Sequence, residues 1–539
     1  MDNHEAAFNK DETMKILVSD SLEQSLIDIL IGEGFEVDNR PGIKPDELSR
    51  IVGAYDALVV RSSTKVTADV INAATKLKIV GRAGTGVDNI DVPAATRRGI
   101  LVMNTPGGNT ISAAEHTVSM LLSLARNIPQ AHMSLAGGEW ERKKFTGTEV
   151  FEKTLGVIGL GKIGREVALR CQGLGMKIVG YDPVLGSDVA AKLNIDLVGL
   201  EELYRRSDFI TVHTPLTNET KHLLNDDTLA RCKRGVRVVN CARGGIIDEA
   251  ALMRALDAGQ VAGAALDVFE QEPPKGNSLL KHPRVVVTPH LGASTEEAQE
   301  KVAFQIAHQI ADALKGRGYA GLVNGAALQL ALNEELTPYL TLAERMGSLV
   351  AQRMTGKLKR LTVGASGELM SSSIEVMKAG VLKGVLSHVQ PDPVNFVNAA
   401  MLATDMGLTI VEQKESAKEG FPNLLSVRYE TDNETMEVSG TVFGASTIRL
   451  VKLDGFRFEV RPEGYLLIYS NIDRPGMLAR VGSILARHNV NIAGVSLGRS
   501  AIGANALTVM SIDSDIPAEG MRELLSQDGV SNLKVVNLD

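Results

Sequence analysis

A glycine-rich segment directly after a short apolar run constrains the fold of this 539-residue chain more than any other feature. The apolar run is Leu155–Ile158, and the segment that follows, Gly159–Gly164 (GLGKIG), fits the spacing G-x-G-x-x-G. In a strand–turn–helix unit the first glycine permits a tight turn, the second lets backbone N–H groups approach a pyrophosphate, and the third lets the helix pack on the strand. The pyrophosphate sits at the positive end of the helix. The segment therefore predicts a dinucleotide site whose helix begins near Lys162.

An acidic residue at the end of the next apolar run indicates which dinucleotide binds. Asp182 lies just after the run Lys177–Gly180. In dinucleotide-binding domains, a carboxylate at this position accepts hydrogen bonds from the adenosine ribose hydroxyls. A carboxylate there repels a 2′-phosphate, and no arginine follows it within residues 182–188. A lone G-x-G-x-x-G can be a simple glycine-rich turn, but this context favours a site for NAD over NADP.

Short apolar runs alternate with amphipathic stretches on both sides of this segment, which is typical of parallel sheets with crossover helices. A helical pattern over Ser294–Leu314 could return the chain to the first unit. We therefore expect an α/β fold in which a Rossmann-type nucleotide-binding domain (111–294) is inserted into a flavodoxin-like substrate domain (14–110 and 295–330). The strands expected in these two domains are Lys15–Ser19, Ala57–Val60, Leu77–Val80, Leu155–Ile158, Lys177–Gly180, Phe209–Val212, Val236–Asn240, Gly263–Leu266 and Val285–Val287.

Two further domains are expected beyond residue 330. Residues 331–462 contain helical patterns followed by strands, which predicts an α+β intervening domain; the helical patterns are Leu340–Met354, Ser373–Ser387 and Pro393–Asp405. Residues 463–539 alternate in the order strand, helix, strand, strand, helix, strand, the βαββαβ order of a split βαβ unit.

Three polar side chains follow predicted strands of the nucleotide-binding domain. They are Arg243, Glu272 and His290. Ligands of open α/β sheets bind beyond the carboxyl ends of the strands, so we expect these side chains in one crevice. Singly, each has an ordinary structural reading as a surface ion pair, a turn or an exposed histidine. Together they predict oxidation of a 2-hydroxy acid.

The chemistry of each residue type fits that reaction. A histidine titrates in the range needed to take the hydroxyl proton near neutral pH. A neighbouring glutamate orients the imidazole and raises its pKa. An arginine fork pairs with the substrate carboxylate.

Charge and cysteine content exclude several function classes. The formal net charge is -8, which gives no electrostatic footprint for nucleic acid or an acidic membrane surface, and no apolar run approaches membrane-spanning length. The three cysteines are widely spaced, which fits neither a disulfide framework nor a zinc site. The segment Met1–Thr13 is polar and lacks the features of a signal or transit peptide. We expect a cytoplasmic protein with no metal and with no nucleic-acid or membrane partner.

Several segments together resemble one enzyme family. The segments Gly159–Gly164, Cys241–Glu249 (CARGGIIDE), Ala265–Pro274 (ALDVFEQEPP) and His290–Thr295 (HLGAST) are similar to the D-isomer-specific 2-hydroxyacid dehydrogenases, with the catalytic trio in the same order. Within that family, Val80–Asp91 (VGRAGTGVDNID), Val102–Asn109 and Trp140–Phe145 (WERKKF) resemble the long-form branch that acts on D-3-phosphoglycerate. The resemblance implies oxidation of D-3-phosphoglycerate to 3-phosphohydroxypyruvate with NAD⁺, the first step of L-serine biosynthesis.

The resemblance also implies which residues bind cofactor and substrate. Residues expected to contact NAD are Gly159, Gly161, Lys162, Ile163, Gly164, Asp182, Thr85, Thr214, Cys241, Ala242, Asp267 and the segment His290–Ala293, including Gly292 and Ala293. Residues expected on the substrate side are Arg61, Ser62, Gly84, Thr85 and Asn104, joined by Arg142. A phosphorylated substrate needs extra positive charge, for which Arg61, Lys65 and Arg142-Lys143-Lys144 are candidates. A charge run is equally typical of a solvated surface. In the family the run reaches a neighbouring subunit, which implies a homodimer or homotetramer.

The segment from Tyr465 onward resembles an ACT domain, a module that commonly binds amino acids at subunit interfaces. Asn471, Asp473 and Asn491 are the candidate effector residues, with L-serine as the expected effector. The match is partial, because some relatives have His and Asn where this chain has Asn471 and Asp473. A purely structural dimerisation module remains the alternative, since these turn residues also serve as caps.

Two other functions remain open from the sequence. The first is a dehydrogenase for another D-2-hydroxy acid, such as 2-hydroxyglutarate, glyoxylate or lactate; Arg61, Asn104 and the 142–144 run favour a phosphorylated substrate instead. The second is an NAD-sensing binding protein, as in co-repressors that share this fold. The ACT-like segment favours amino-acid metabolism over that function.

Overall fold

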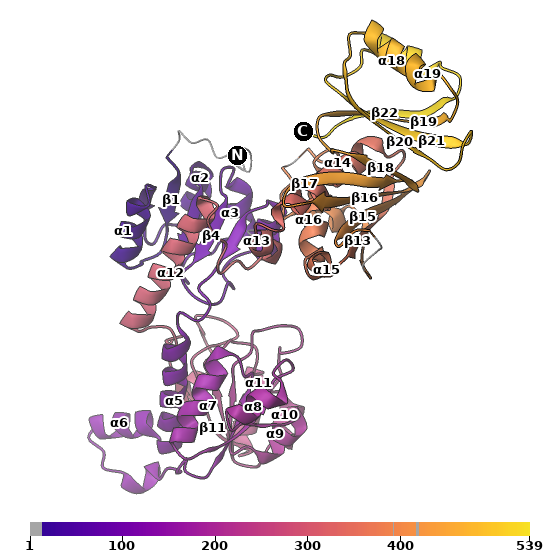
Figure 1. The fold of residues 1–539 in the computed structure, drawn as a ribbon. Coiled ribbons are helices and arrows are strands. Elements are labelled where there is room, and N and C mark those ends of the chain that lie inside the picture. Colours follow the sequence, from indigo (N-terminus) through magenta and orange to yellow (C-terminus); the bar gives the residue numbers. More distant parts are fainter. Residues whose placement is uncertain (1–12, 332, 392, 417–419) are drawn as a thin grey trace.

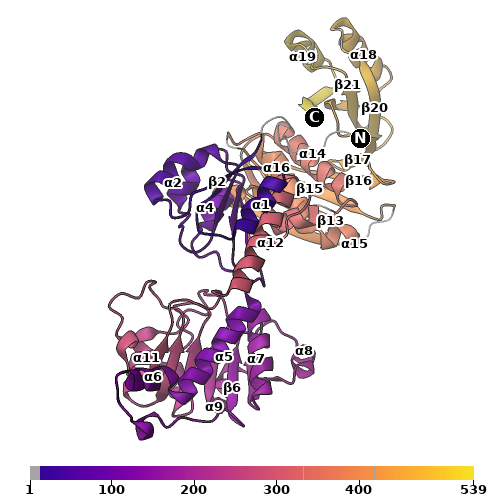
Figure 2. The ribbon, with the colours of Figure 1, turned by 90° about the vertical axis from the view of Figure 1, so that its left-hand side faces the viewer.

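The computed structural model describes residues 13–539 except 332, 392 and 417–419, so the polar segment 1–12 lies outside the described residues. Figures 1 and 2 show an elongated molecule in which a lower body is joined to the body above it near the starts of helices α5 (Thr110–Arg126) and α12 (Glu296–Leu314). Two more bodies follow beside and above, ending in the yellow C-terminal domain. The lower body is the one that carries the glycine-rich segment.

The upper of the two joined bodies is a parallel sheet in the order β2-β1-β3-β4-β5, which is the flavodoxin-like order. Its core is formed by strands whose side chains are almost all apolar and buried, such as β3. One face packs against α1 and α12 through residues such as Ile306 and Ile310, and the other against α2, α3 and α4. The bounds are β1 Lys15–Val18, α1 Gln24–Gly32, β2 Glu36–Asn39, α2 Pro45–Ile51, β3 Ala57–Val60, α3 Ala68–Ala73, β4 Ile79–Arg82, α4 Val92–Arg97 and β5 Leu101–Met103.

The lower body is a parallel sheet in the order β12-β11-β10-β9-β6-β7-β8, covered by helices on both faces. The strand order reverses at β6, which pairs with β7 on one side and β9 on the other, so the crevice beyond β6 and β9 is the topological switch point. The strands are β6 Thr154–Ile158, β7 Lys177–Tyr181, β8 Asp196–Leu197, β9 Phe209–Val212, β10 Val236–Asn240, β11 Val261–Leu266 and β12 Val285–Val287. The helices, besides α5, are α6 Ile128–Ala136, α7 Lys162–Gly173, α8 Ser187–Lys192, α9 Leu200–Arg206, α10 Asp226–Arg231, α11 Glu249–Asp257 and the short turns η2 Arg142–Phe145 and η3 Ser278–Lys281.

The intervening body is a mixed sheet in the order β14-β13-β15-β16-β17-β18, with α14 and α16 packed into one apolar core. Its elements are α13 Ala326–Ala331, α14 Thr337–Arg353, β13 Leu358–Ser366, α15 Glu368–Ser372, α16 Ile374–Leu386, α17 Ala399–Asp405, β14 Thr409–Glu415, β15 Leu424–Thr431, β16 Thr435–Phe443, β17 Thr447–Leu453 and β18 Phe456–Val460. Hydrogen bonds tie it to the first body, for example from Asn395 Nδ2 to Gly99 O at 2.9 Å.

One helix predicted in this body was wrong in its first half. The pattern over Pro393–Asp405 begins as a helix only at Ala399. The preceding residues form a turn in which Asn395 N donates to Asn398 Oδ1 at 2.7 Å and Asn398 Nδ2 donates to Pro393 O at 2.9 Å. Asparagine side chains compete with the helix ladder in this way, so the apolar periodicity before Ala399 carries no helix.

The C-terminal body is an antiparallel sheet in the order β20-β21-β19-β22 under two helices (Figure 1). The order β19 Tyr465–Ile472, α18 Met477–Arg487, β20 Ile492–Arg499, β21 Asn505–Ile512, α19 Ala518–Leu525 and β22 Val530–Asn537 confirms the expected βαββαβ fold. The predicted fold class is thus confirmed in all four bodies. Among the described helices, none combines the length and apolar character that crossing a membrane would require.

Candidate active site

A direct polar contact at the crevice joins two of the three predicted catalytic residues. His290 Nδ1 lies 2.8 Å from Glu272 Oε2, and the two side chains are 47% and 39% exposed. Glu272 follows β11 and His290 follows β12, so the contact forms where these neighbouring strands end. Because Nδ1 faces the carboxylate, Nε2 is left free to exchange a proton with a substrate.

His290 adopts a backbone conformation that is uncommon for its residue type, with φ at +55°. Its N–H donates to Asp267 O at 2.9 Å, and the next two residues, Leu291 and Gly292, donate to the Asp267 carboxylate at 2.7 and 2.9 Å. Left-handed backbone outside glycine persists where the surroundings over-determine it, often at functional sites. The loop is therefore fixed so that the imidazole meets Glu272.

Charges around the pair set its proton affinity. The hydrogen bond that His290 donates to Glu272 raises the pKa of His290, and burial opposes this. The charge of Asp267 raises that pKa further, and the charge of Arg243 lowers it. Burial tends to raise the pKa of Glu272, but the contact with His290 lowers it overall, so the carboxylate stays charged. An imidazole with a raised pKa beside a charged carboxylate fits a general base.

Arg243 lies on the same side of the crevice and reaches across to the first body. Its Nε donates to Asp88 Oδ2 at 2.9 Å, and its Nη1 donates to Ala242 O at 2.6 Å. The turn that presents it is shaped by Asn240, whose Oδ1 accepts from Ala242 N at 3.0 Å and whose Nδ2 donates to Arg243 O at 2.8 Å. The next residue, Gly244, lies so close to Phe269 that a Cβ would stand 1.8 Å from Phe269 O. The loops carrying Arg243 and Glu272 therefore pack directly together.

An apolar pocket of about 360 Å³ adjoins the catalytic pair. Its lining includes Phe269, Pro273, Leu280 and Pro289 as well as Glu272 and His290. These apolar side chains lower the polarity on one side of the His290–Glu272 pair, which strengthens its electrostatic interaction.

The glycine-rich turn has the open space and backbone geometry that a pyrophosphate requires. Gly159 has φ at +92°, and a Cβ on it would lie 2.7 Å from His213 O. A Cβ on Gly164 would lie 2.0 Å from Gly159 O, whereas a Cβ on Gly161 would meet nothing within 4 Å. Gly161 precedes α7, whose N-terminus carries no side-chain cap. Nearby, Thr214 Oγ1 is buried without a hydrogen-bond partner among the described residues. These features fit a bound dinucleotide.

Asp182 directly follows β7, and its carboxylate accepts hydrogen bonds from the backbone of two turns. Oδ2 accepts from Leu160 N at 2.8 Å, and Oδ1 accepts from Val184 N and Leu185 N at 2.8 and 3.0 Å. Burial tends to raise the pKa of Asp182, but these backbone hydrogen bonds lower it overall, and the charge of Arg165 adds to them. The carboxylate is therefore charged, and its contact with the ribose hydroxyls of NAD stays a prediction.

Replacing Asp182 with alanine is expected to raise the KM for NAD⁺ roughly ten- to hundredfold, the range of a lost charged hydrogen bond. The KM for NADP⁺ should fall, because the repulsion disappears while Arg165 remains nearby. Initial rates with each cofactor measure both effects. Asp182→Asn is the intermediate variant, since its one amide oxygen can accept either from Leu160 N or from Val184 N and Leu185 N, while the charge is lost. Unchanged preference in both variants would contradict this role.

Other predicted cofactor residues occupy varied positions. Lys162 Nζ donates to Pro106 O at 3.3 Å, and Thr85 Oγ1 donates to Asn109 Oδ1 at 2.7 Å, so both lie between the two bodies. Asp267 is completely buried. Its direct contact with NAD stays a prediction. Ile163 lies in the first turn of α7, and the residues on the turns after β10 and β12 are Cys241, Ala242, Gly292 and Ala293.

The predicted substrate residues, except one, lie on the first body. Arg61 and Ser62 follow β3, and Arg61 N donates to Asp20 Oδ2 at 2.5 Å. Gly84 follows β4 with φ at +154°, and Asn104 Nδ2 donates to Thr85 O at 2.5 Å. The strands β3, β4 and β5 pair in parallel, so these residues share the carboxyl edge of the sheet.

Arg142 is not brought to this group within one chain. It lies in η2, after α6. The segment from Asn127 to Thr148 is held at the amino end of the strands of the lower sheet, whereas the catalytic residues follow the carboxyl end. Thr148 N donates to Ala125 O at 2.8 Å, and Gln130 Nε2 donates to Val285 O, at the start of β12, at 3.3 Å. A role for Arg142 at the substrate therefore requires a second subunit.

The candidate effector residues are also separated within one chain. Asn471 is buried, with Oδ1 accepting from Thr508 Oγ1 at 2.9 Å, and Asp473 Oδ2 accepts from Arg499 Nη1 at 3.2 Å. Asn491 lies at the other end of β20 and donates to Asp513 Oδ2 at 2.7 Å. The three can form one site only between two copies of the domain.

Two residues that the sequence did not single out contact the candidate site. Asp88 pairs with Arg243, and His116 Nε2 lies 3.1 Å from both Asp267 Oδ1 and Thr288 Oγ1. His116 comes from α5, 151 positions before Asp267, so no local pattern could have paired them. The possible metal-ligand atoms of His116, Cys241 and Asp267 lie within 4.8 Å of one another. The Asp267 oxygens, however, already accept hydrogen bonds from Leu291 N and Gly292 N.

Comparisons with known proteins identify three of the domains. Residues 118–292 match the model of the D-isomer specific 2-hydroxyacid dehydrogenase NAD binding domain, residues 335–454 that of the D-3-phosphoglycerate dehydrogenase intervening domain, and residues 465–529 that of the ACT domain. The D-3-phosphoglycerate dehydrogenase of a Synechocystis strain is 44% identical over 97% of this chain and 95% of its own length. The chain belongs to the D-3-phosphoglycerate dehydrogenase branch of the D-isomer specific 2-hydroxyacid dehydrogenases. It is an NAD-dependent oxidoreductase, as the sequence predicted.

Two more relatives show how far the similarity extends. The human D-3-phosphoglycerate dehydrogenase is 45% identical over 94% of this chain and 96% of its own length. A crystal structure of a glyoxylate reductase from Paecilomyes thermophila is 28% identical, with a TM-score of 0.54, over 58% of this chain and 98% of its own. Full-length similarity is thus to long-form enzymes, while the glyoxylate reductase matches little more than half of the chain.

Proposed function

We propose that this protein oxidises D-3-phosphoglycerate to 3-phosphohydroxypyruvate with NAD⁺, the first step of L-serine biosynthesis. The observation that carries the proposal is the His290–Glu272 pair at the end of a dinucleotide-binding sheet, with Arg243 beside it. Similarity over nearly the full length to D-3-phosphoglycerate dehydrogenases supports the choice of substrate.

Each of the three catalytic residues has a separate role in the reaction. NAD⁺, when bound at Gly159–Gly164 and Asp182, supplies the acceptor for the hydrogen that leaves C2. His290 Nε2 takes the proton of the C2 hydroxyl, and Glu272 stabilises the imidazolium that results. Arg243 binds the substrate carboxylate through guanidinium N–H groups other than the Nε that Asp88 holds, and its charge stabilises the developing carbonyl oxygen. In the reverse direction the imidazolium returns the proton.

The phosphate of the substrate would bind the cationic edge of the first body. Arg61 lies at this edge, after β3, and Arg82 lies at the end of β4. Burial, and to a smaller extent the charges of Arg243 and Arg61, lower the pKa of Arg82 to about 10. A buried guanidinium close to two other positive charges is stabilised by an added dianion. This favours a phosphorylated acid over an unsubstituted one.

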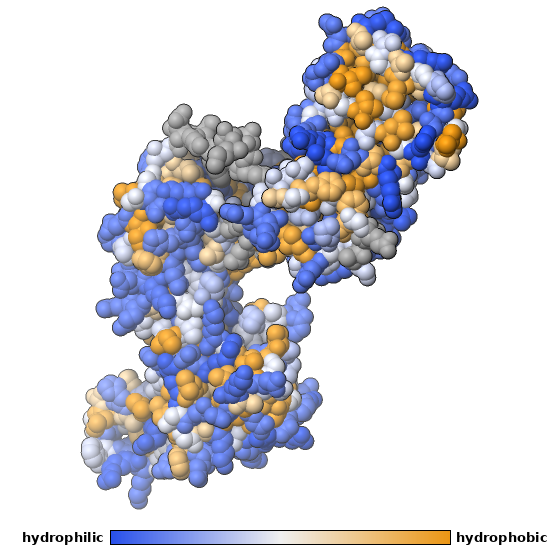
Figure 3. All heavy atoms as spheres, viewed as in Figure 1, coloured by the Kyte–Doolittle hydropathy of each residue, from blue (hydrophilic) through white to orange (hydrophobic). Residues whose placement is uncertain are grey.

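We infer that the functional unit is a homodimer or homotetramer. Helix α6 has no buried residue, and its apolar side chains are exposed together with the following Trp140; Ile128 is 53%, Met133 70%, Leu135 57% and Trp140 76% exposed. These residues belong to the tip at the lower left of Figure 3. A monomer rarely leaves such a surface uncovered, and a second copy would also bring Arg142 towards a neighbouring crevice.

The ACT domain is proposed to bind L-serine between two copies, because Asn471 and Asp473 lie at one end of the sheet and Asn491 at the other. We further infer a cytoplasmic location. All three cysteines are described and free, and Cys171 and Cys232 are buried thiols whose pKa burial raises to about 12. Such thiols fit a reducing compartment.

NADH formation from D-3-phosphoglycerate and NAD⁺ at alkaline pH, with and without L-serine, tests these proposals. Turnover is expected, and suppression by serine would support the effector site. Turnover indifferent to serine would keep the reaction and reject serine as effector. Absence of turnover, with NADH still bound, would reject the substrate; activity on glyoxylate, lactate or 2-hydroxyglutarate, or binding of short peptides without turnover, would then identify the alternative.

A further inference from the structure

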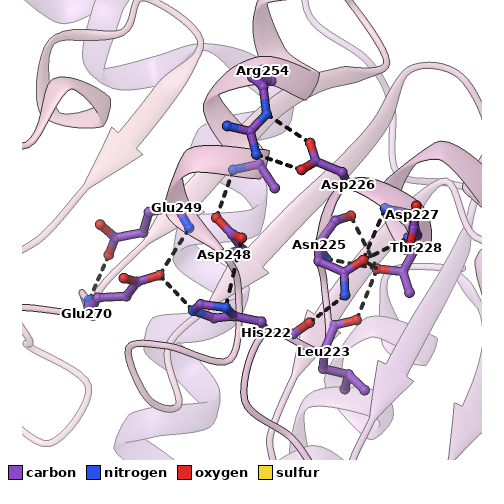
Figure 4. A network of polar contacts seen from close by, with 11 residues as sticks. His222, Leu223, Asn225, Asp226, Asp227, Thr228, Asp248, Glu249, Arg254 and Glu270 are labelled. Carbon is purple, nitrogen blue, oxygen red and sulfur yellow. Dashed lines mark hydrogen bonds and ion pairs between the residues drawn. The ribbon is translucent and has the colours of Figure 1, made fainter.

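One side chain holds both ends of the segment that carries Glu272. Glu249 is the first residue of α11 and the last residue of the CARGGIIDE motif. Its Oε1 accepts from Glu270 N at 2.7 Å, and its Oε2 accepts from Asn277 Nδ2 at 2.6 Å. Glu270 returns the contact, since its Oε1 accepts from Glu249 N at 3.2 Å (Figure 4). The two glutamates therefore join α11 and the segment reciprocally.

The helix itself does not require this glutamate. Asp248 is the N-cap of α11, and its Oδ1 accepts from Ala251 N at 2.9 Å. Glu249 is half-buried, and burial together with the charge of Glu270 raises its pKa, so its carboxylate is held where a charge is costly. A residue placed at such a cost, beyond the needs of its own helix, indicates a role in the segment that it contacts.

Glu272 lies inside the segment that Glu249 holds. Between Glu270 and Asn277 the backbone forms local turns, with Lys275 N donating to Pro273 O at 2.9 Å and Asn277 N to Pro274 O at 3.3 Å. Glu272 then has two polar contacts at its carboxylate, from Phe269 N at 3.2 Å and from His290 Nδ1 at 2.8 Å. The position of its carboxylate against His290 therefore depends on where the ends of the segment are fixed.

We propose that Glu249 is a positioning residue for the reaction, because its carboxylate clamps both ends of the Glu270–Asn277 segment to α11 and so keeps Glu272 against His290. This role rests on the proposed dehydrogenase function. Releasing the clamp would let Glu272 move away from the imidazole, and the imidazole would lose the partner that orients it.

The other charged groups around the clamp have contacts that do not involve the Glu249 side chain, so we expect them to stay in place when Glu249 is replaced. His222 lies between two of them, with Nε2 3.2 Å from Glu270 Oε1 and Nδ1 3.8 Å from Asp248 Oδ2 (Figure 4). Around His290 itself the charged groups are Glu272, Asp267 and Arg243. Asp267 and Arg243 do not contact Glu249, so a change in the titration of His290 would report on Glu272.

The test is the pH dependence of kcat/KM for D-3-phosphoglycerate oxidation in the full-length enzyme carrying Glu249→Ala or Glu249→Gln. A general base must be neutral, so oxidation increases as pH rises through the pKa of His290, which Glu272 holds above its ordinary value. In Glu249→Ala we expect this acid limb to move to lower pH by roughly 0.5–1 unit, a part of the effect of an adjacent opposite charge. We also expect kcat to fall about tenfold, as displaced catalytic groups produce.

Glu249→Gln should lie between the alanine variant and the wild type, because its amide oxygen can still accept from Glu270 N. Arg254→Gln is the matched control on the same helix; Arg254 pairs with Asp226 at 2.6 Å, away from the segment, and its loss should leave the acid limb unmoved. An acid limb that stays in place in Glu249→Ala, whether or not kcat falls, would overturn the positioning role. If the wild type itself shows no turnover, the proposed function fails rather than the clamp.

Discussion

Replacing His290 with alanine is expected to lower kcat for D-3-phosphoglycerate oxidation by about 10²–10⁴, the range that general acid–base catalysis contributes. The Nε2 atom of the imidazole would take the hydroxyl proton, because Glu272 holds Nδ1 and raises the pKa of His290. Affinity for NADH, measured by fluorescence titration, should stay near the wild-type value, because the dinucleotide cradle at Gly159–Gly164 is unchanged. Loss of NADH binding together with turnover would instead assign His290 a structural role.

The backbone at His290 calls for a second variant. A φ of +55° is strained for alanine but tolerated by asparagine. His290→Asn therefore keeps the loop while removing the base, and it should lose as much activity as His290→Ala. A much milder loss in the asparagine variant would show that loop geometry, not proton transfer, accounts for the alanine result.

Glu272→Gln tests the effect of the Glu272 charge on the pKa of His290. The charge of Glu272 raises the pKa of His290, so removing it moves the acid limb of the oxidation profile to lower pH. Reduction of 3-phosphohydroxypyruvate needs the protonated imidazole, and its rate should fall at a lower pH than in the wild type. Opposite shifts in the two directions would contradict a shared base.

The sequence predicted the elements whose pattern is local. Buried, β-branched runs such as Phe209–Val212 and Val236–Asn240 have the predicted bounds as β9 and β10. The edge strand β2 was not predicted, because Glu36–Asn39 carries mostly polar, partly exposed side chains and has no apolar run. The false start of the helix at Pro393 has a similar origin, since asparagine side-chain contacts decide the backbone there.

At the site, local motifs predicted which residues lie after which strands, and topology then brings Glu272 and His290 together. Contacts between distant segments were beyond reach. Asp88 meets Arg243 across 155 positions and two bodies, and Glu249 meets Glu270 across 21. Both residues lie in motifs that the sequence had already marked, so the motif was the signal, and only the structure gives the partner.

Replacing Arg243 with alanine is expected to reduce kcat/KM for D-3-phosphoglycerate by about 10²–10³, since truncating one partner of a hydrogen-bonded charge pair costs about 2–5 kcal/mol. The guanidinium donates to Asp88 through Nε and to Ala242 O through Nη1, and we expect its other N–H groups to bind the substrate carboxylate. Arg243→Lys should recover at most about tenfold, because an ammonium keeps the charge but loses the planar fork. Initial rates over a range of substrate concentration measure both variants.

Asp88→Asn distinguishes binding of substrate from support of the fold. Asparagine can still accept from Arg243 Nε, so the guanidinium keeps its orientation while the competing negative charge disappears. The KM for D-3-phosphoglycerate should then fall or stay level, with little change in kcat. A loss in Asp88→Asn as large as in Arg243→Ala would mean that the ion pair between the two bodies, rather than the guanidinium's contact with substrate, is what the enzyme needs. Arg243 is 29% exposed at the junction between the two bodies, so thermal unfolding of each variant is also measured. A variant that loses only a contact with substrate should have a lower kcat/KM and an unchanged Tm. A variant that loses a structural bridge should have a lower kcat/KM and a lower Tm.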